Sequence, residues 1–173
     1  AATGAVAGLC PITEASLGDG IFNGTTWRDS SGRLGFGSDS NIRIALAEEL
    51  RGLEYSQRLR DHGRAVLAEP GRSTGRVLYQ AGLDGGATAA GRETGAIAPG
   101  LWADLVAICT NNAVMVGRRG DAALDSLIFA GGDGLVSEVW AAGRHVVTAG
   151  RHHDHDAITA AYMDCILHLQ ARL

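Results

Sequence analysis

The chain has 173 residues, a formal net charge of -4 and a pI of about 5.8. This weakly acidic composition provides no positive field that attracts nucleic acid, so we exclude nucleic acid as a partner. No uncharged apolar stretch reaches the ~18 residues of a membrane-spanning helix, and no basic segment precedes an apolar core as in a signal peptide. We therefore expect a soluble, cytoplasmic protein that does not bind membranes.

The three cysteines, Cys10, Cys109 and Cys165, are odd in number and far apart in the sequence. They lack the C-x-x-C spacing of a metal or redox site, and so wide a spacing does not indicate a disulfide framework. We expect reduced, partly buried thiols.

The first predicted element is a short buried strand over residues 5–10, because the residues there are apolar without alternation. Residues 11–20 are rich in turn formers and are predicted as a loop that leaves the carboxyl end of this strand. A second buried strand is predicted over residues 33–37. The chain begins with Ala1 almost directly before the first strand and without an initiator Met. We interpret this beginning as an interior part of a longer protein, with a processed chain as the alternative.

A helix is predicted from about Ile42, because apolar residues recur there at four- and three-residue steps. Ser40 or Asn41 is the natural N-cap of this helix. The helix is predicted to end near Gly63, or to continue to Ala68 before a Pro-Gly pair stops it.

A second helix is predicted from Thr74 to about Ala81 or slightly further, with Ser73 as its N-cap. The chain then becomes rich in strands and ends in an amphipathic helix from about Asp156 to Leu173. The predicted strands, of which the last two form a hairpin, cover residues 103–108, 126–130, 135–141 and 145–149.

Asp39 is the most informative residue, because it stands in a Gly-Ser-Asp-Ser turn that follows the second strand and precedes a helix. The carboxyl end of a strand is where an α/β barrel places its chemistry. An ionised Asp only accepts hydrogen bonds, so it can ligate a metal and take a proton from activated water. The alternative is that Asp39 or Ser40 caps the turn or the following helix by accepting backbone N–H groups.

Four stretches of the sequence resemble the amidohydrolase superfamily, and specifically its formimidoylglutamate deiminases. Residues 8–20 (GLCPITEASLGDG) are similar to the loop after the seventh barrel strand, and residues 37–40 (GSDS) to the end of the eighth. Residues 48–59 (EELRGLEYSQRL) resemble the helix that follows, and they favour this branch over guanine or cytosine deaminases. Residues 95–106 (GAIAPGLWADLV) resemble the return into a small β-sandwich and indicate only the superfamily.

The resemblance implies an α/β fold in which an eight-stranded β/α barrel is flanked by a β-sandwich. Residues 1–90 are then the last two β/α units of the barrel, residues 91–150 part of the sandwich, and residues 151–173 a C-terminal helix. The implied reaction hydrolyses the formimino C=N bond of N-formimino-L-glutamate, a small-molecule substrate, to N-formyl-L-glutamate and ammonia in histidine breakdown.

The family uses one divalent metal, usually Zn²⁺, although a single carboxylate is also compatible with Fe or Mn. Asp39 matches the family's aspartate, which binds the metal and serves as the catalytic base. The resemblance also implies a homodimer.

The chain departs from the family because the other metal ligands are absent. The family's His-x-His pair, its later barrel histidines and its catalytic glutamate belong to strands that would precede Ala1. A barrel of this kind needs ~250 residues, so 173 residues that include a sandwich do not close it. We expect the missing N-terminal part, or another chain that carries it, as a partner. Two alternatives stay open, namely another aminohydrolase of the superfamily and a catalytically silent structural fragment.

Four polar residues flank the expected position of the Asp39 carboxylate. Glu14 and Asp19 follow the first strand and are candidates for contacting substrate or orienting a metal ligand. Ser40 and Ser38 are candidate hydrogen-bond partners of Asp39. Each of the four fits a local role in capping a turn equally well.

His153-Asp154-His155 also contains an H-x-H pattern, but it lies in a polar stretch before the last predicted helix. We interpret it as a solvated turn with Asp156 as the helix N-cap, and adventitious binding of a metal is the alternative.

Overall fold

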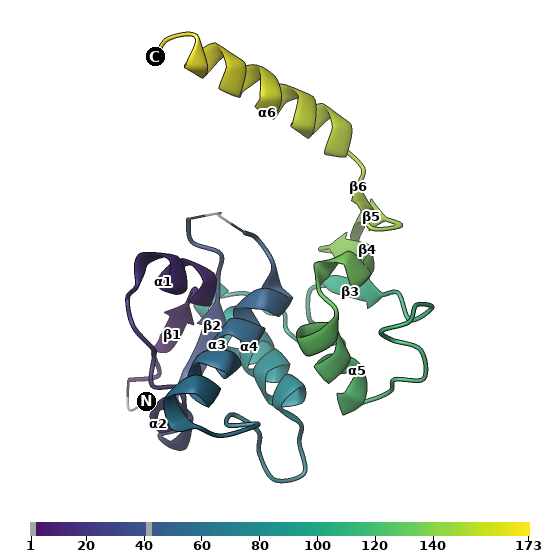
Figure 1. Cartoon of the computed structure of the whole chain (residues 1–173). Helices are drawn as coiled ribbons and strands as arrows, with labels where there is room; N and C mark the ends of the chain where they lie inside the picture. The colour runs from purple at the N-terminus through teal and green to yellow at the C-terminus, as the bar shows by residue number, and fades with distance from the viewer. Residues whose placement is uncertain (1–2, 41–42) are drawn as a thin grey trace.

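A computed structural model describes residues 3–40 and 43–173 and has a mixed α/β fold (Figure 1). The amino-terminal half contains β1 (Val6–Leu9), α1 (Pro11–Leu17), α2 (Gly24–Asp29), β2 (Arg33–Phe36), α3 (Leu46–Asp61) and α4 (Thr74–Ala90). The carboxy-terminal half contains β3 (Leu105–Ile108), α5 (Asp121–Asp125), the π-helix η1 (Ser126–Ala130), the 3₁₀-helix η2 (Asp133–Leu135), β4 (Val136–Ala141), β5 (Arg144–Thr148), β6 (Arg151–His152) and α6 (His155–Gln170).

The first sheet consists of β1 and β2, which pair in parallel from Val6 opposite Arg33 to Leu9 opposite Phe36. The two strands predicted over residues 5–10 and 33–37 are thereby confirmed, although only Leu9, Leu34 and Gly35 in them are buried. Because parallel strands end at the same edge of a sheet, the segments that follow Leu9 and Phe36 lie side by side. The backbone N–H of Gly37 extends this pairing by donating to the carbonyl oxygen of Leu9 at 3.0 Å.

Helix α4 packs directly on β2, and a glycine makes this contact possible. A Cβ atom on Gly85 would lie 1.7 Å from the carbonyl oxygen of Leu34, a distance that no side chain can occupy. Helix α3 packs beside α4 and α1, so the three helices enclose one apolar core with the small sheet. The buried members of this core are Leu9, Leu34, Leu50, Leu53, Leu67, Leu78 and Ile128.

The second sheet is antiparallel, in the order β3-β4-β5-β6. The strands predicted over residues 103–108 and 135–141 are confirmed with slightly shorter bounds, and the strand predicted over 145–149 is confirmed one residue earlier. Ala142 and Gly143 form the predicted hairpin turn between β4 and β5, and both have positive φ angles, of 51° and 78°. Strand β6, which covers only Arg151 and His152, was not predicted.

The prediction of a strand over residues 126–130 is wrong. These residues form η1, which continues α5 and turns Leu127 and Ile128 into the core. Arg51 of α3 donates to the carbonyl oxygens of Ile128 and Gly131, at 2.7 and 2.9 Å, at the end of this helix. A run of five mostly apolar residues has no periodicity that separates a buried strand from a buried helix, which explains the error.

Residues 11–17 form helix α1, whereas a loop was predicted there. Pro11 occupies the first turn, where its missing N–H is not needed, and Gly18 ends the helix in the left-handed conformation, at φ 75°. Residues that favour turns are thus used at the two ends of a short helix.

Helix α3 begins at Leu46, later than predicted, with Ala45 as an N-cap that makes no side-chain hydrogen bond. Ser40 is therefore not the cap, and the proposed cap Asn41 and starting residue Ile42 lie outside the described residues. Helix α3 ends at Asp61, with His62 in the left-handed conformation, close to the predicted Gly63.

Helix α4 begins as predicted, because the side chain of Ser73 accepts the backbone N–H of Arg76 at 3.2 Å. It continues to Ala90, well beyond the predicted end near Ala81. Gly82, Gly85 and Gly86 do not interrupt it, and the packing on β2 described above compensates for their low helix propensity.

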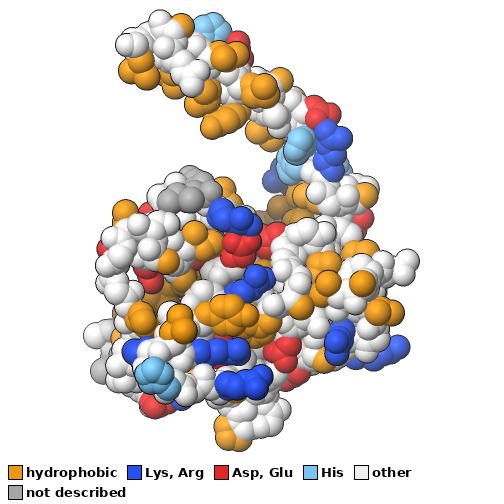
Figure 2. Space-filling model, in the orientation of Figure 1, with side chains coloured by type: hydrophobic (Ala, Val, Ile, Leu, Met, Phe, Trp, Pro, Cys, Tyr) orange, Lys and Arg blue, Asp and Glu red, His pale blue; other side chains and the backbone are white. Residues whose placement is uncertain are grey.

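Helix α6 extends away from the rest of the molecule, and none of its residues is buried (Figure 1). Asp154, not Asp156, is its N-cap residue, and Asp156 instead pairs with Arg151. Figure 2 shows hydrophobic side chains gathered along this helix. Its exposed apolar residues are Ile158, Tyr162, Met163, Leu167 and Leu169.

Within the described part of the chain, no helix is long and apolar enough to cross a membrane. All three cysteines are free. Cys10 is half-buried, but Cys109 and Cys165 are exposed, so the prediction of partly buried thiols is wrong for these two.

Candidate functional site

Asp39 lies in the turn after β2, at the edge where β1 and β2 both end. Its side chain is exposed and its φ angle is 46°, in the left-handed region that residues other than glycine rarely adopt. Among residues 3–40 and 43–173, the Asp39 carboxylate accepts no hydrogen bond and forms no ion pair. Within the described residues, therefore, no capping bond of its side chain explains this aspartate.

The charge of Asp39 affects the pKa of the thiol of Cys10, the residue that directly follows β1. Burial raises the pKa of the Cys10 thiol, and the carboxylates of Asp39, Glu49 and Glu14 raise it further, against a hydrogen bond from the backbone of Gly37 that lowers it. Because a thiol must ionise to become a nucleophile, this environment disfavours nucleophilic catalysis by Cys10.

Glu14 has a local role in the structure. One of its carboxylate oxygens accepts the backbone N–H of Cys10 at 2.7 Å, which satisfies a free donor at the start of α1. Asp19 is exposed in the segment after α1. The structure thus ties Glu14 to its own helix, although both residues remain on the side of the molecule where β1 ends.

Ser40 and Ser38 are held by Thr13 of α1, a residue that the sequence did not single out. The Thr13 side chain is buried, and its hydroxyl lies 3.2 Å from the carbonyl oxygen of Ser38 and 3.0 Å from the hydroxyl of Ser40. These contacts join α1 to both residues that flank Asp39.

Glu49 of α3 is a second residue that was missed. It is only 2 % exposed, and one oxygen accepts the backbone N–H of Ile12 at 2.9 Å, while the other is buried without a partner in the described chain. A signal for Glu49 was present in the sequence, because it lies three residues after Leu46 and four before Leu53, on the stripe that faces the core.

The His-x-His pattern lies elsewhere, at the start of α6 and away from β1 and β2 (Figure 1). His153 is in a turn and bonds the hydroxyl of Thr148, while His155 begins α6 and bonds Asp156. Within the described residues, no group of three or more His, Cys, Asp or Glu side chains is arranged to hold a metal ion. The turn predicted for this pattern is therefore found at His153 and Asp154.

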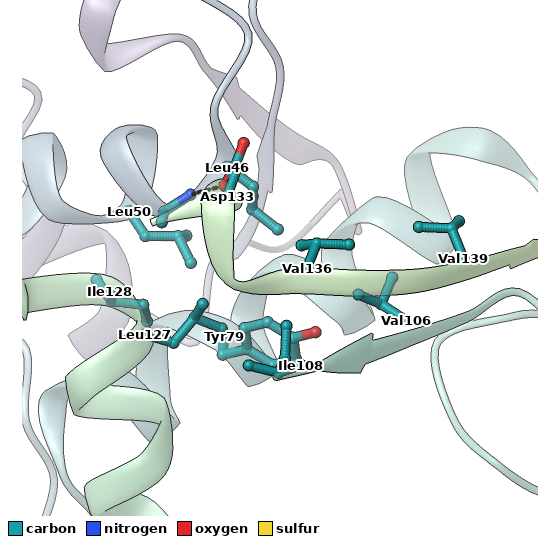
Figure 3. Close-up of a pocket in the computed structure, with 11 residues that line it drawn as sticks. Leu46, Leu50, Tyr79, Val106, Ile108, Leu127, Ile128, Asp133, Val136 and Val139 are labelled. Carbon is teal, nitrogen blue, oxygen red and sulfur yellow. Dashed lines mark hydrogen bonds between the residues drawn. The ribbon is translucent and has the colours of Figure 1, made fainter. Parts of the chain in front are cut away.

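An apolar cavity of about 200 Å³ lies between α3, α4, η1 and the second sheet (Figure 3). Among its lining residues, Asp133 alone is charged, and this carboxylate accepts the N–H of Ala47 at the start of α3, at 3.5 Å. That charge serves the helix end, and the remaining lining is aliphatic apart from Tyr79, so the cavity is mainly apolar. The candidate site is the edge that carries Asp39.

No protein-family model matches the sequence. A formimidoylglutamate deiminase from Pseudomonas aeruginosa is 47% identical over 167 residues, which are 96% of this chain and 37% of that protein. The crystal structure of an amidohydrolase from Brucella melitensis matches 96% of this chain and 36% of its own, with a TM-score of 0.88 and 42% identity. An adenosine deaminase from Xanthomonas campestris with bound zinc matches with a TM-score of 0.80 at 24% identity, which shows the fold alone.

The chain is thus similar over nearly its whole length to amidohydrolases. More particularly, it is similar to the carboxy-terminal part of a formimidoylglutamate deiminase, the branch that residues 48–59 indicated. The chain spans little more than a third of the length of the relatives it matches.

Proposed function

We propose that this chain forms the carboxy-terminal part of a metal-dependent enzyme that hydrolyses the formimino C=N bond of N-formimino-L-glutamate. The products are N-formyl-L-glutamate and ammonia, which places the reaction in histidine breakdown. The observation that carries this proposal is the 47% identity to a formimidoylglutamate deiminase across 96% of the chain. The exposed Asp39, at the edge where β1 and β2 end, supplies a group suited to that chemistry.

In the proposed architecture, residues 1–90 supply the last two β/α units of a β/α barrel, and residues 91–150 supply part of a β-sandwich. The parallel pairing of β1 and β2 supports the first assignment, because barrel strands are parallel and their carboxyl ends carry the active site. The antiparallel sheet β3-β4-β5-β6 supports the second. Residues 151–173 are the closing helix, preceded by the short β6.

Asp39 fits the role of a single metal ligand, because its carboxylate has no competing partner in the described chain. Other ligands come from the remainder of the protein, since residues 3–40 and 43–173 contain no set of three. Zinc is the metal that the family resemblance implies, and a single carboxylate is also compatible with Fe or Mn. A bound divalent metal would lower the pKa of water to about 7 and polarise the scissile bond.

As the catalytic base, Asp39 accepts a proton from the attacking water and passes it to the departing nitrogen. Its exposed position leaves the carboxylate accessible to a substrate at this edge. An amidine nitrogen leaves as ammonia only after protonation, so a base that returns its proton serves both halves of the reaction.

The rest of the barrel is the partner that this proposal requires, on the same polypeptide or on another chain. The unburied apolar residues of α6 support such a partner, because an exposed apolar face of this kind is typically covered. The complete protein is proposed to be a cytoplasmic homodimer, as the family resemblance implies.

A catalytically silent structural fragment is the second candidate, and the lack of a three-ligand set in the described residues favours it for the chain in isolation. A related aminohydrolase with another substrate is the third. The fold similarity to an adenosine deaminase, at 24% identity, does not distinguish such an aminohydrolase from the proposed formimidoylglutamate deiminase.

A chimeric enzyme tests the proposal: residues 1–173 replace the matching segment of the P. aeruginosa deiminase. We expect ammonia release from N-formimino-L-glutamate, no release from guanine or cytosine, and about one bound metal per chain. The 173-residue chain alone should show neither turnover nor stoichiometric metal. If the folded chimera acts only on another amine or amidine, the proposed substrate is wrong. If the 173-residue chain alone turns over the substrate, the prediction that it is inactive in isolation is wrong.

A further inference from the structure

The backbone of Asp39 requires support from its surroundings. A non-glycine residue with a φ angle of 46° is sterically strained, and such a conformation persists only where neighbouring contacts hold it in place. Asp39 is exposed and its own carboxylate makes no hydrogen bond within the described residues. The support must therefore act on the residues beside it.

Thr13 contacts both of these residues with one hydroxyl group. Its O–H donates to the carbonyl oxygen of Ser38 at 3.2 Å. Since a hydroxyl has a single proton, the 3.0 Å contact with Ser40 is then a bond that the Ser40 hydroxyl donates to Thr13. Thr13 thus fixes the residue before Asp39 and the residue after it.

Thr13 is itself held firmly, because α1 is anchored on α3. Glu49 of α3 accepts the backbone N–H of Ile12 at 2.9 Å, next to Thr13 in the sequence. A Cβ atom on Gly52 of α3 would lie 3.1 Å from the Cβ atom of Pro11, so the two helices are in close contact. With an exposed fraction of 2 %, Thr13 has no freedom to reorient toward solvent.

We propose that Thr13 is a positioning residue for Asp39, which links the two strand-end segments so that the carboxylate keeps the orientation needed for its reaction. The inference rests on the proposed function, because only there does Asp39 act on a metal and a substrate. Thr13 itself contacts neither.

The test replaces Thr13 by Val, which keeps the shape and removes the hydroxyl, and by Ser, which keeps the hydroxyl. Thr74→Val is the matched control, since Thr74 is also buried and its hydroxyl makes no hydrogen bond in the described chain. In the 173-residue chain, hydrogen exchange of the amides of residues 38–40 is measured. In the chimeric enzyme, kcat, KM and metal retention against a chelator are measured.

We expect Thr13→Val to speed exchange at residues 38–40 by about tenfold and to lower kcat and metal affinity by roughly 10–100-fold, with KM nearly unchanged. Thr13→Ser should stay within about threefold of the unaltered protein, as should Thr74→Val. A Thr13→Val protein that matches the Thr74→Val control in exchange and in metal retention overturns the proposal.

Ser40→Ala provides a second variant in case Thr13→Val does not fold, because Ser40 is exposed and its removal leaves the core intact. Ser40→Ala should speed hydrogen exchange at residues 38–40 and lower metal retention, both by a smaller factor than Thr13→Val. Unchanged values overturn the proposal. The Asp39→Asn variant separates this result from a failure of the proposed function. If Asp39 does not bind a metal, Asp39→Asn also leaves metal retention unchanged.

Discussion

At the scale of single residues, the candidate site is defined by carboxylates in unlike environments. Asp39 is exposed with no partner in the described chain, Glu14 is tied to the start of its own helix, and Glu49 is buried against α1. Of these three, Asp39 alone combines exposure with a carboxylate that has no partner in the described chain. The charge of Asp39 and the burial of Glu49 each have an effect that a pH titration of the chain can measure.

Cys10 serves as a reporter of the Asp39 charge. In a Cys109→Ser, Cys165→Ser background, Asp39→Asn should lower the pKa of the Cys10 thiol, because it removes a negative charge that opposes thiolate formation. The pH dependence of Cys10 alkylation measures this shift, and Asp19→Asn should leave it unchanged. An unaltered midpoint in Asp39→Asn means that the carboxylate is not beside the end of β1.

Glu49 should make the stability of the chain depend on pH. Burial raises the pKa of its carboxyl, opposed by the hydrogen bond from Ile12, and the charges of Glu14 and Glu48 raise it further. The folded state therefore holds a proton that the unfolded state releases, so the free energy of unfolding falls as pH rises through the range just above the ordinary carboxyl pKa.

Glu49→Gln removes this titration and keeps an oxygen that can accept the N–H of Ile12. Its stability relative to the unaltered chain should therefore increase from about pH 4 to about pH 7 in urea unfolding. Glu93→Gln, on the exposed surface, is the control. A difference that stays constant with pH shows that the pKa of Glu49 is not raised.

At the scale of elements, the packing of α4 on β2 determines where the strand carrying Asp39 lies. Gly85→Ala should lower the free energy of unfolding by ~1–3 kcal/mol or more, because its Cβ atom would overlap the carbonyl oxygen of Leu34. The neighbouring Gly86→Ala meets no atom within 4 Å and should gain ~0.5–1 kcal/mol from higher helix propensity. Equal effects of the two changes in urea unfolding would mean that the helix does not approach the strand this closely.

The elements differ in how far their sequences predict them. Short apolar runs identified β1 and β2, and Ser73 marked the start of α4, because such runs and N-capping depend on local sequence. Helix α1 and η1 were mistaken, since Pro and Gly at helix ends resemble a loop and a short apolar run fits either structure.

The residues of the candidate site also differ in how far the sequence predicts them. Asp39 was identified because its place after a strand and its family resemblance are both visible in the sequence. The contacts of Thr13 with the turn around Asp39 were not predicted, because residues 25 and 27 positions apart meet only when β1 and β2 pair. Contacts of this kind depend on tertiary structure rather than on local pattern.

At the scale of the whole molecule, α6 has little to pack against in the chain alone. Helices of this length are marginal in water without tertiary contacts, and none of the residues of α6 is buried. We expect its amides to exchange hydrogen at least tenfold faster than those of α4 in the isolated chain, and to become protected in the chimeric enzyme. Strong protection of α6 in the monomeric chain alone would show that the rest of a barrel is not its partner.

The most direct measurement of the central claim is ammonia release from N-formimino-L-glutamate by the chimeric enzyme with Asp39→Asn. Asparagine keeps the size of the side chain and loses the base, so turnover should fall by about a thousandfold or more while the chain stays folded. The control is Glu93→Gln, an exposed carboxylate after α4, which should retain full turnover. Near-normal activity of the Asp39→Asn enzyme would contradict the account, because Asp39 would then be only a residue of the turn.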